Sequence, residues 1–123
     1  MGLQRNNGSN EGVVTVAIDR DVALSRVGGD AELLKEIAQL FLEDYPKSME
    51  DVRRAALSGD AKCLERAAHG LKGSVANFGA AAAVEAALTL ETMGRARNLA
   101  EVEQVLRSLE LALAALRPEL ESL

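Results

Sequence analysis

Apolar residues recur every three or four positions through most of this 123-residue chain, a spacing that predicts helices rather than strands. The pattern is clearest near the C-terminus, where the steps alternate between four and three: Val102, Leu106, Leu109, Leu113, Leu116 and Leu120. Such a stripe lies along one side of a helix and suits the left-handed packing of helix bundles. We therefore expect a helix from about Ala100, with Pro118 as a point where it bends or ends early.

A short helix is predicted ahead of the others. Asp19 is placed to cap its N-terminus, because a carboxylate can accept hydrogen bonds from the free N–H groups of the first turn. Gly28 and Gly29 supply a stop, since glycine adopts the left-handed conformation that ends many helices. The side chains expected to turn inward are Val22, Leu24 and Val27.

The next predicted helix is long and starts behind Asp30, a second capping aspartate. Its apolar positions keep their spacing almost to its end: Leu34, Ala38, Phe41, Tyr45, Met49, Val52 and Ala56. The stripe continues through Pro46, so one kinked helix ending near Ser58 is favoured. Two helices with a break before Pro46 are the alternative.

Two more helices follow. Asp60 is placed to cap the first, which should end near residues 77–79. Its apolar stripe is Leu64, Ala67, Ala68, Leu71, Val75 and Phe78. The second helix runs from about residue 80 to 97, with one face formed by Ala80, Ala83, Ala87, Leu90 and Gly94. Four of these five residues are alanine or glycine, so a neighbouring helix can approach closely.

The predicted elements add up to an all-α domain. Short connections make consecutive helices antiparallel, so we expect an up-and-down four-helix bundle preceded by the short helix. With 48% hydrophobic residues the chain can build one core, and a single domain over residues 13–123 is expected. Residues 1–12 are polar, which predicts a flexible tail or linker. Residues 13–18 look strand-like but have no partner strand, so an extended lead-in is expected.

Composition argues against several classes of function. The 14 basic and 19 acidic residues give a net charge of −5 without a basic cluster, so nucleic acid is not an expected partner. Apolar runs are too short for membrane insertion and no signal peptide is recognisable, so a cytoplasmic location is expected. Cys63, the only cysteine, is expected to be a small residue at the edge of the core. One His and one Cys are too few ligands for a zinc site.

His69 is the only histidine, and its position carries the functional argument. It falls about 140° from the middle of the apolar stripe, on the solvent side of its helix. Gly70 and Gly73 lie beside it, although each costs about 1 kcal/mol relative to alanine in a helix interior. An approaching partner surface is the simplest reason to tolerate that cost. Lys72, three residues on, is close enough for its ammonium to meet a group attached to the ring.

A phosphoryl group would suit both His69 and Lys72. A neutral imidazole is a nucleophile near pH 7, and a lysine can stabilise charge on the transferred oxygens. The chain has no Gly-rich nucleotide loop and no clear acidic cluster for magnesium. A partner therefore has to supply those parts, and no cofactor is expected on this chain.

The segment around His69 resembles the phosphoacceptor motif of histidine-containing phosphotransfer (HPt) domains of two-component phosphorelays: Ala68-His-Gly-Leu-Lys-Gly-Ser-Val-Ala-Asn-Phe-Gly-Ala80. Further blocks resemble the same family: Val27-Gly-Gly-Asp-Ala-Glu-Leu-Leu34, Phe41-Leu-Glu-Asp-Tyr-Pro46, Ala56-Leu-Ser-Gly-Asp60 and Leu90-Glu91. The resemblance spans most of residues 19–116. It implies a four-helix bundle that takes a phosphoryl group from the aspartate of one receiver domain and passes it to another, without a kinase active site of its own.

The resemblance also implies roles for single residues. His69 would be the phosphoacceptor, Lys72 would support the phosphoryl group, and Gly73 would leave the gap through which the receiver approaches. Gly79 matches the family's glycine at the helix turn. The implied partners are receiver domains of response regulators, which would bind the magnesium ion, and a hybrid sensor histidine kinase is a further candidate. The domain itself is expected to be a monomer.

Two departures and two alternatives accompany this interpretation. Gly70 replaces the more usual polar residue after the histidine, and Val75 is larger than the residue common at its position. One alternative is a helical module that docks on receivers or kinases without carrying phosphate. The other is the phosphoacceptor domain of a chemotaxis-type kinase, which takes phosphate from ATP through a kinase domain in trans. The blocks upstream of His69 fit the phosphorelay type better.

Overall fold

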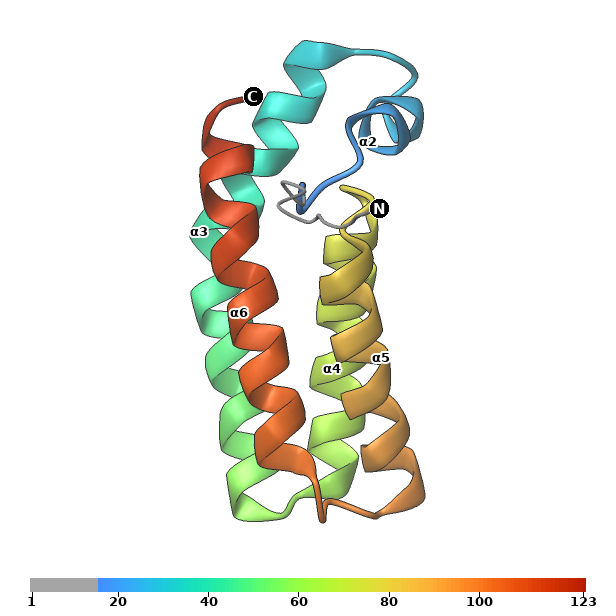
Figure 1. The fold of residues 1–123 in the computed structure, drawn as a ribbon, viewed down its shortest axis with the longest axis vertical. Helices are drawn as coiled ribbons and strands as arrows, with labels where there is room; N and C mark the ends of the chain where they lie inside the picture. Colours follow the sequence, from blue (N-terminus) through green and yellow to red (C-terminus); the bar gives the residue numbers. More distant parts are fainter. Residues whose placement is uncertain (1–15) are drawn as a thin grey trace, which may run out of the picture.

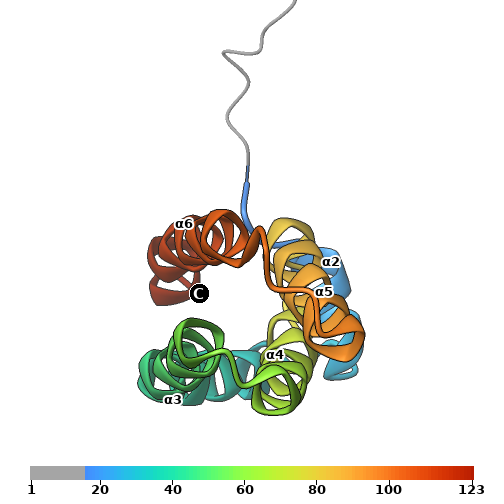
Figure 2. The same cartoon turned by 90° about the horizontal axis from the view of Figure 1, so that it is seen from below.

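The computed structural model describes residues 16–123 and contains five helices in that part: α2 (Arg20–Arg26), α3 (Ala31–Ser58), α4 (Ala61–Ala76), α5 (Ala81–Ala96) and α6 (Val102–Glu121). The four long helices run up and down the molecule, and α2 lies at one end of them (Figure 1). Seen along the bundle, each long helix occupies one corner, in the order α3, α4, α5, α6 (Figure 2). The predicted all-α bundle with a short additional helix is confirmed. The predicted tail at residues 1–12 lies outside the described residues.

The predicted helix starts are confirmed by their capping hydrogen bonds. Asp19, Asp30 and Asp60 each accept a hydrogen bond from the backbone N–H three residues later. Each side chain satisfies one of the N–H groups that the first turn of a helix leaves without a partner. The local sequence is therefore sufficient to predict where these three helices begin.

Neither internal proline ends its helix. The long helix α3 continues through Pro46, so the alternative of two helices is wrong. The last helix continues past Pro118 to Glu121, so the expectation of an early end is also wrong. Both prolines are exposed. Because water can reach the surface around them, a carbonyl that loses its N–H partner there can be hydrated.

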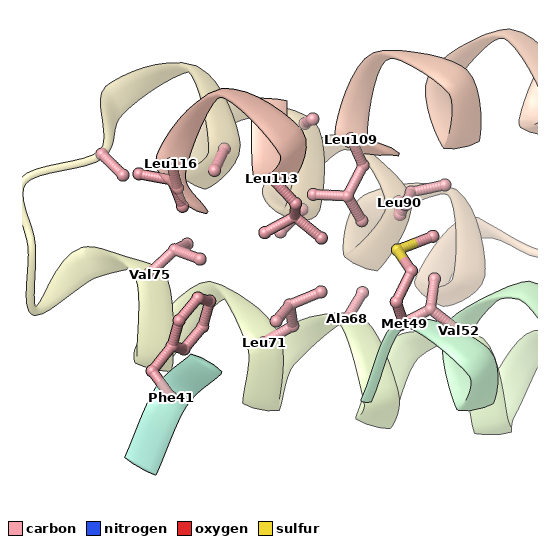
Figure 3. Close-up of a cluster of buried hydrophobic side chains, with 14 of the residues drawn as sticks. Phe41, Met49, Val52, Ala68, Leu71, Val75, Leu90, Leu109, Leu113 and Leu116 are labelled. Atoms are coloured by element: carbon pink, nitrogen blue, oxygen red, sulfur yellow. The ribbon is translucent and has the colours of Figure 1, made fainter. Parts of the chain in front are cut away.

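The core follows the predicted stripes. All six predicted stripe positions of α6 are buried, and Leu109, Leu113 and Leu116 face buried side chains of α3, α4 and α5 (Figure 3). Phe41 packs edge-on against Phe78 with ring centroids 5.4 Å apart, and Tyr45, which is only partly buried, stacks on Phe41. None of the helices in the described part is long and apolar enough to cross a membrane.

The short helix α2 contributes less to the core than expected. Ala23 is its fully buried residue, whereas Val22, Leu24 and Val27 are only partly buried. From its place at the end of the bundle (Figure 1) the helix still packs Leu24 and Val27 against the core. The prediction of inward side chains is confirmed for these two residues, although neither is fully buried, whereas Val22 is not among the side chains that pack against the core.

The lead-in to α2 packs against the far end of the chain. The backbone N–H groups of Ala17 and Ile18 donate hydrogen bonds to the carboxylate of Glu119 on α6, at 2.6 and 3.0 Å. Residues 16–18 form no strand, which agrees with an extended lead-in for the described portion of that segment.

Cys63 is exposed, and its predicted place at the edge of the core is wrong. It directly precedes Leu64, which is fully buried. One residue is a turn of about 100° around a helix, which places Cys63 at the flank of the buried stripe, where α3 does not cover it.

Helices α4 and α5 approach closely where the sequence places small residues. A Cβ added at Gly94 would lie 2.7 Å from the carbonyl oxygen of Ala61 and 2.7 Å from the backbone nitrogen of Glu65. Both of these atoms belong to the α4 backbone, so only glycine fits at this contact. The predicted close approach is confirmed, and it brings the side chains of the two helices together along their shared edge.

Candidate functional site

His69 projects from the solvent side of α4, as the helical projection predicts. Its side chain is 68% exposed, whereas the neighbouring Ala68 and Leu71 are buried in the core. The imidazole therefore stands on a rigid element whose opposite face is fixed by packing.

Glu91 of α5 holds one side of the imidazole. Its Oε2 lies 2.9 Å from Nδ1 of His69, and its side chain is only 4% exposed. Sequence reasoning placed Glu91 in a block that resembles the HPt family but gave it no role. A signal was available, because Glu91 follows Ala87 by four residues and precedes Gly94 by three, on the face predicted to be buried. A carboxylate at a buried position needs partners.

Lys72 reaches the same carboxylate. Its Nζ lies 2.7 Å from Oε1 of Glu91. The ammonium and the carboxylate oxygen form an ion pair at this distance. The structure thus brings His69 and Lys72 together through Glu91 rather than by direct contact.

Arg95 completes the cluster and was not predicted from the sequence. Its Nη2 donates a hydrogen bond of 2.8 Å to Oε2 of Glu91, and its Nε donates one of 3.1 Å to Oε2 of Glu65 on α4. The guanidinium therefore joins a buried carboxylate on its own helix to a half-exposed one on the next helix.

These contacts fix the protonation of the site. The Lys72 ammonium beside Glu91, with a further contribution from the hydrogen bond to His69, holds the pKa of the carboxyl group below its ordinary value of 4.5, although burial opposes the shift. Glu91 is therefore ionised at neutral pH and can only accept hydrogen bonds. Since Glu91 accepts, Nδ1 of His69 must be the donor. The other ring nitrogen, Nε2, then carries a free lone pair when the imidazole is neutral.

Open space lies beside the histidine at both neighbouring glycines. A Cβ added at Gly70 or Gly73 would meet no atom within 4 Å. Neither glycine has a positive φ, so neither is required by the backbone conformation. The packing of this domain therefore does not explain why glycine occupies these two helical positions.

Gly79 has a structural reason of its own. Its φ is +61°, and an added Cβ would lie 2.6 Å from Cβ of Asp19. The turn between α4 and α5 can thus accept the start of α2, whose Asp19 N–H donates a hydrogen bond to the carbonyl oxygen of Phe78. This agrees with the glycine at the helix turn that the resemblance implied.

The described residues offer no group of three or more His, Cys, Asp or Glu side chains arranged to hold a metal ion. The chemistry that the arrangement itself supports is nucleophilic. An exposed imidazole has one nitrogen engaged by a carboxylate and the other without a partner among residues 16–123, with a lysine close by and open space at the two neighbouring glycines.

Comparison with known proteins agrees with the fold. The family model described as "Hpt domain" matches residues 36–119, more than half of the chain. The crystal structure of histidine-containing phosphotransfer protein B (HptB) from Pseudomonas aeruginosa PAO1 superposes with a TM-score of 0.80 at 22% sequence identity, and the match covers 89% of this chain and 95% of that one. No match is found among curated proteins.

Proposed function

Because this chain belongs to the Hpt domain family and acts in histidine phosphotransfer within a phosphorelay, we propose that His69 is the residue that carries the phosphoryl group. The observation that carries the assignment is that the chain has a single histidine, and this histidine is exposed with Nδ1 bonded to Glu91. A phosphohistidine therefore has only one possible location in this chain. Nε2 is the nitrogen left free to form it.

The proposed transfer begins with a receiver domain that holds a phosphoryl group as an acyl phosphate on its aspartate. The lone pair of Nε2 attacks the phosphorus, the Nε2–P bond forms, and the bond between phosphorus and the aspartate oxygen breaks. The aspartate leaves as a carboxylate, and the ring keeps its Nδ1 proton. The ring then carries positive charge, which the ionised Glu91 stabilises through the hydrogen bond from Nδ1. The reverse reaction returns the group to a second receiver.

Lys72 and Gly73, in the helical turn that follows His69, are proposed to support this step. The Lys72 ammonium lies one turn from His69 and can neutralise charge on the phosphoryl oxygens. Gly73, with no side chain and open space around it, lets a receiver bring its aspartate close to Nε2. The partners are therefore receiver domains, and the magnesium ion that phosphoryl transfer needs is expected on the receiver.

The test is phosphate exchange with a radiolabelled, phosphorylated receiver. The parent protein should take up label that is lost in acid and kept in base, whereas His69→Gln should take up none. Lys72→Gln should bind the receiver but take up label more slowly, and Arg107→Gln, a change of equal charge at an exposed position on α6, should behave like the parent. Uptake of label by His69→Gln at the parental level would contradict the assignment. Tight receiver binding that is unchanged in His69→Ala, without any acid-labile phosphate, would instead indicate a docking module.

A further inference from the structure

Glu91 has more cationic partners than one negative charge requires. His69 Nδ1 and Arg95 Nη2 both contact Oε2, at 2.9 and 2.8 Å, and Lys72 Nζ contacts Oε1 at 2.7 Å. Two full positive charges and one imidazole therefore surround a single buried carboxylate. The phosphoacceptor role of His69 gives no reason for the second full cation.

The two cations are held very differently. Arg95 is fixed at two points, because its guanidinium bonds to Glu91 through Nη2 and to Glu65 through Nε. Within residues 16–123 Lys72 pairs only with Glu91, at a single point. A flexible lysine held at one point leaves at lower cost than a guanidinium that bridges two helices.

Phosphorylation would draw these cations apart. A phosphoryl group on Nε2 brings about two negative charges to the surface of α4. Lys72 is partly exposed, with 27% of its side chain accessible, so its ammonium can turn outward to that group. Glu91 cannot follow, because its side chain is 4% exposed. If Lys72 were its only other counter-charge, its departure would leave the buried anion with the phosphorylated ring alone, whose positive charge is also balanced by its own phosphoryl group; this loss is costly.

On the basis of the proposed function, we propose that Arg95 is a positioning residue that frees Lys72 for the phosphoryl group. Fixed by Glu65, Arg95 remains on Glu91 as its counter-charge, keeps the carboxylate ionised and keeps it bonded to Nδ1 of His69. Lys72 exchanges its partner from Glu91 to the phosphoryl oxygens as the Nε2–P bond forms. Glu65 acts indirectly, because it holds the guanidinium of Arg95 in place.

A double-mutant cycle tests this exchange. The donor is phosphoramidate, a small molecule that needs no receiver: Nε2 attacks phosphorus, the P–N bond breaks, and ammonia leaves. In Arg95→Met, the ammonium of Lys72 still pairs with Glu91 before the reaction. When it moves to the phosphoryl group, Glu91 loses its remaining full counter-charge, so phosphorylation should slow roughly tenfold. In the Lys72→Met background no exchange takes place, and Glu91 lacks that cation both before and after. The further change Arg95→Met should then slow the reaction less than about threefold.

Glu65→Gln alone should slow phosphorylation, but by less than Arg95→Met does. Added to the Lys72→Met protein, Glu65→Gln should change the rate little. Arg107→Met is the charge-matched control, because Arg107 is exposed on α6 and has no ion pair among residues 16–123. Circular dichroism and urea unfolding identify variants that do not fold. A merely structural role for Arg95 would slow the reaction equally in both backgrounds, and equal factors would overturn the exchange. Failure of the underlying function is a separate result, since the parent protein would then take up no acid-labile phosphate from phosphoramidate.

Discussion

Gly73 and Gly94 both lie inside helices, yet the structure predicts that replacing them with alanine changes stability in opposite directions. At Gly73 an added Cβ meets no atom within 4 Å, so only the helix propensity changes. Alanine is favoured over glycine in a helix interior by about 1 kcal/mol. We expect Gly73→Ala to raise the free energy of unfolding by that amount, which corresponds to roughly 0.5 M in the urea midpoint.

Gly94→Ala gains the same helix propensity, but its added Cβ collides with the backbone of α4, which lowers the stability. Its Cβ would lie 2.7 Å from two backbone atoms of α4, and no flexible side chain can move aside. Forcing atoms into a packed contact costs about 1–3 kcal/mol, and the absence of any flexible neighbour places this site at the upper end. The net expectation is a loss of about 2 kcal/mol after the gain of about 1 kcal/mol from propensity.

The assay is urea unfolding of the two variants and the parent, followed by circular dichroism at 222 nm, with Gly70→Ala as a second open-space control. A Gly73→Ala protein that is no more stable than the parent would contradict the open space around Gly73. A Gly94→Ala protein as stable as Gly73→Ala would refute the close contact between α4 and α5. Gly73→Ala should also receive the phosphoryl group from a receiver more slowly than the parent. That combination would show that glycine at this position serves access at the expense of stability.

Three further outcomes follow from other contacts. Glu91→Gln should lower the free energy of unfolding at pH 7 by about 1–2 kcal/mol, less than for a fully buried pair because its cationic partners stay partly exposed. The folded pKa of Glu91 lies below its unfolded value of 4.5, so its contribution is complete above pH 4.5. Urea unfolding should show the deficit shrinking as the pH falls through the folded value; a deficit that grows would contradict this sign. Gly79→Ala combines a positive φ with a Cβ placed 2.6 Å from Asp19, and thermal unfolding should reveal a loss of about 2–4 kcal/mol. Glu119→Ala should speed hydrogen exchange at the amide of Ile18 without changing exchange in the bundle core, and unchanged protection would show that the carboxylate does not hold the lead-in.

Much of the fold was predictable because helical information is local. A capping aspartate acts on a backbone N–H three residues away, so Asp19, Asp30 and Asp60 mark their helices whatever lies beyond. The same period that buries Leu71 turns His69 outward, and the structure confirms its exposure.

The predictions that failed concern residues whose environment depends on neighbouring helices or on solvent. A break at Pro46 depends on whether the surroundings can satisfy the freed carbonyl, and the exposed surface there allows α3 to continue. The exposure of Cys63 depends on how far α3 covers the edge of α4, which the stripe of α4 alone does not specify. Composition gave only the average behaviour of a cysteine.

The helices, their buried faces and the single exposed histidine can be derived from the amino-acid sequence, because each follows from a period of 3.6 residues and from contacts within one turn. What surrounds that histidine depends on how the helices pack. His69 and Glu91 are 22 residues apart on antiparallel helices, and their meeting depends on how far α5 is shifted along α4. Periodicity specifies the face of a helix but not this shift. Close backbone contact at Gly94 holds the two helices together one turn beyond Glu91, and the carboxylate comes to lie between His69, Lys72 and Arg95.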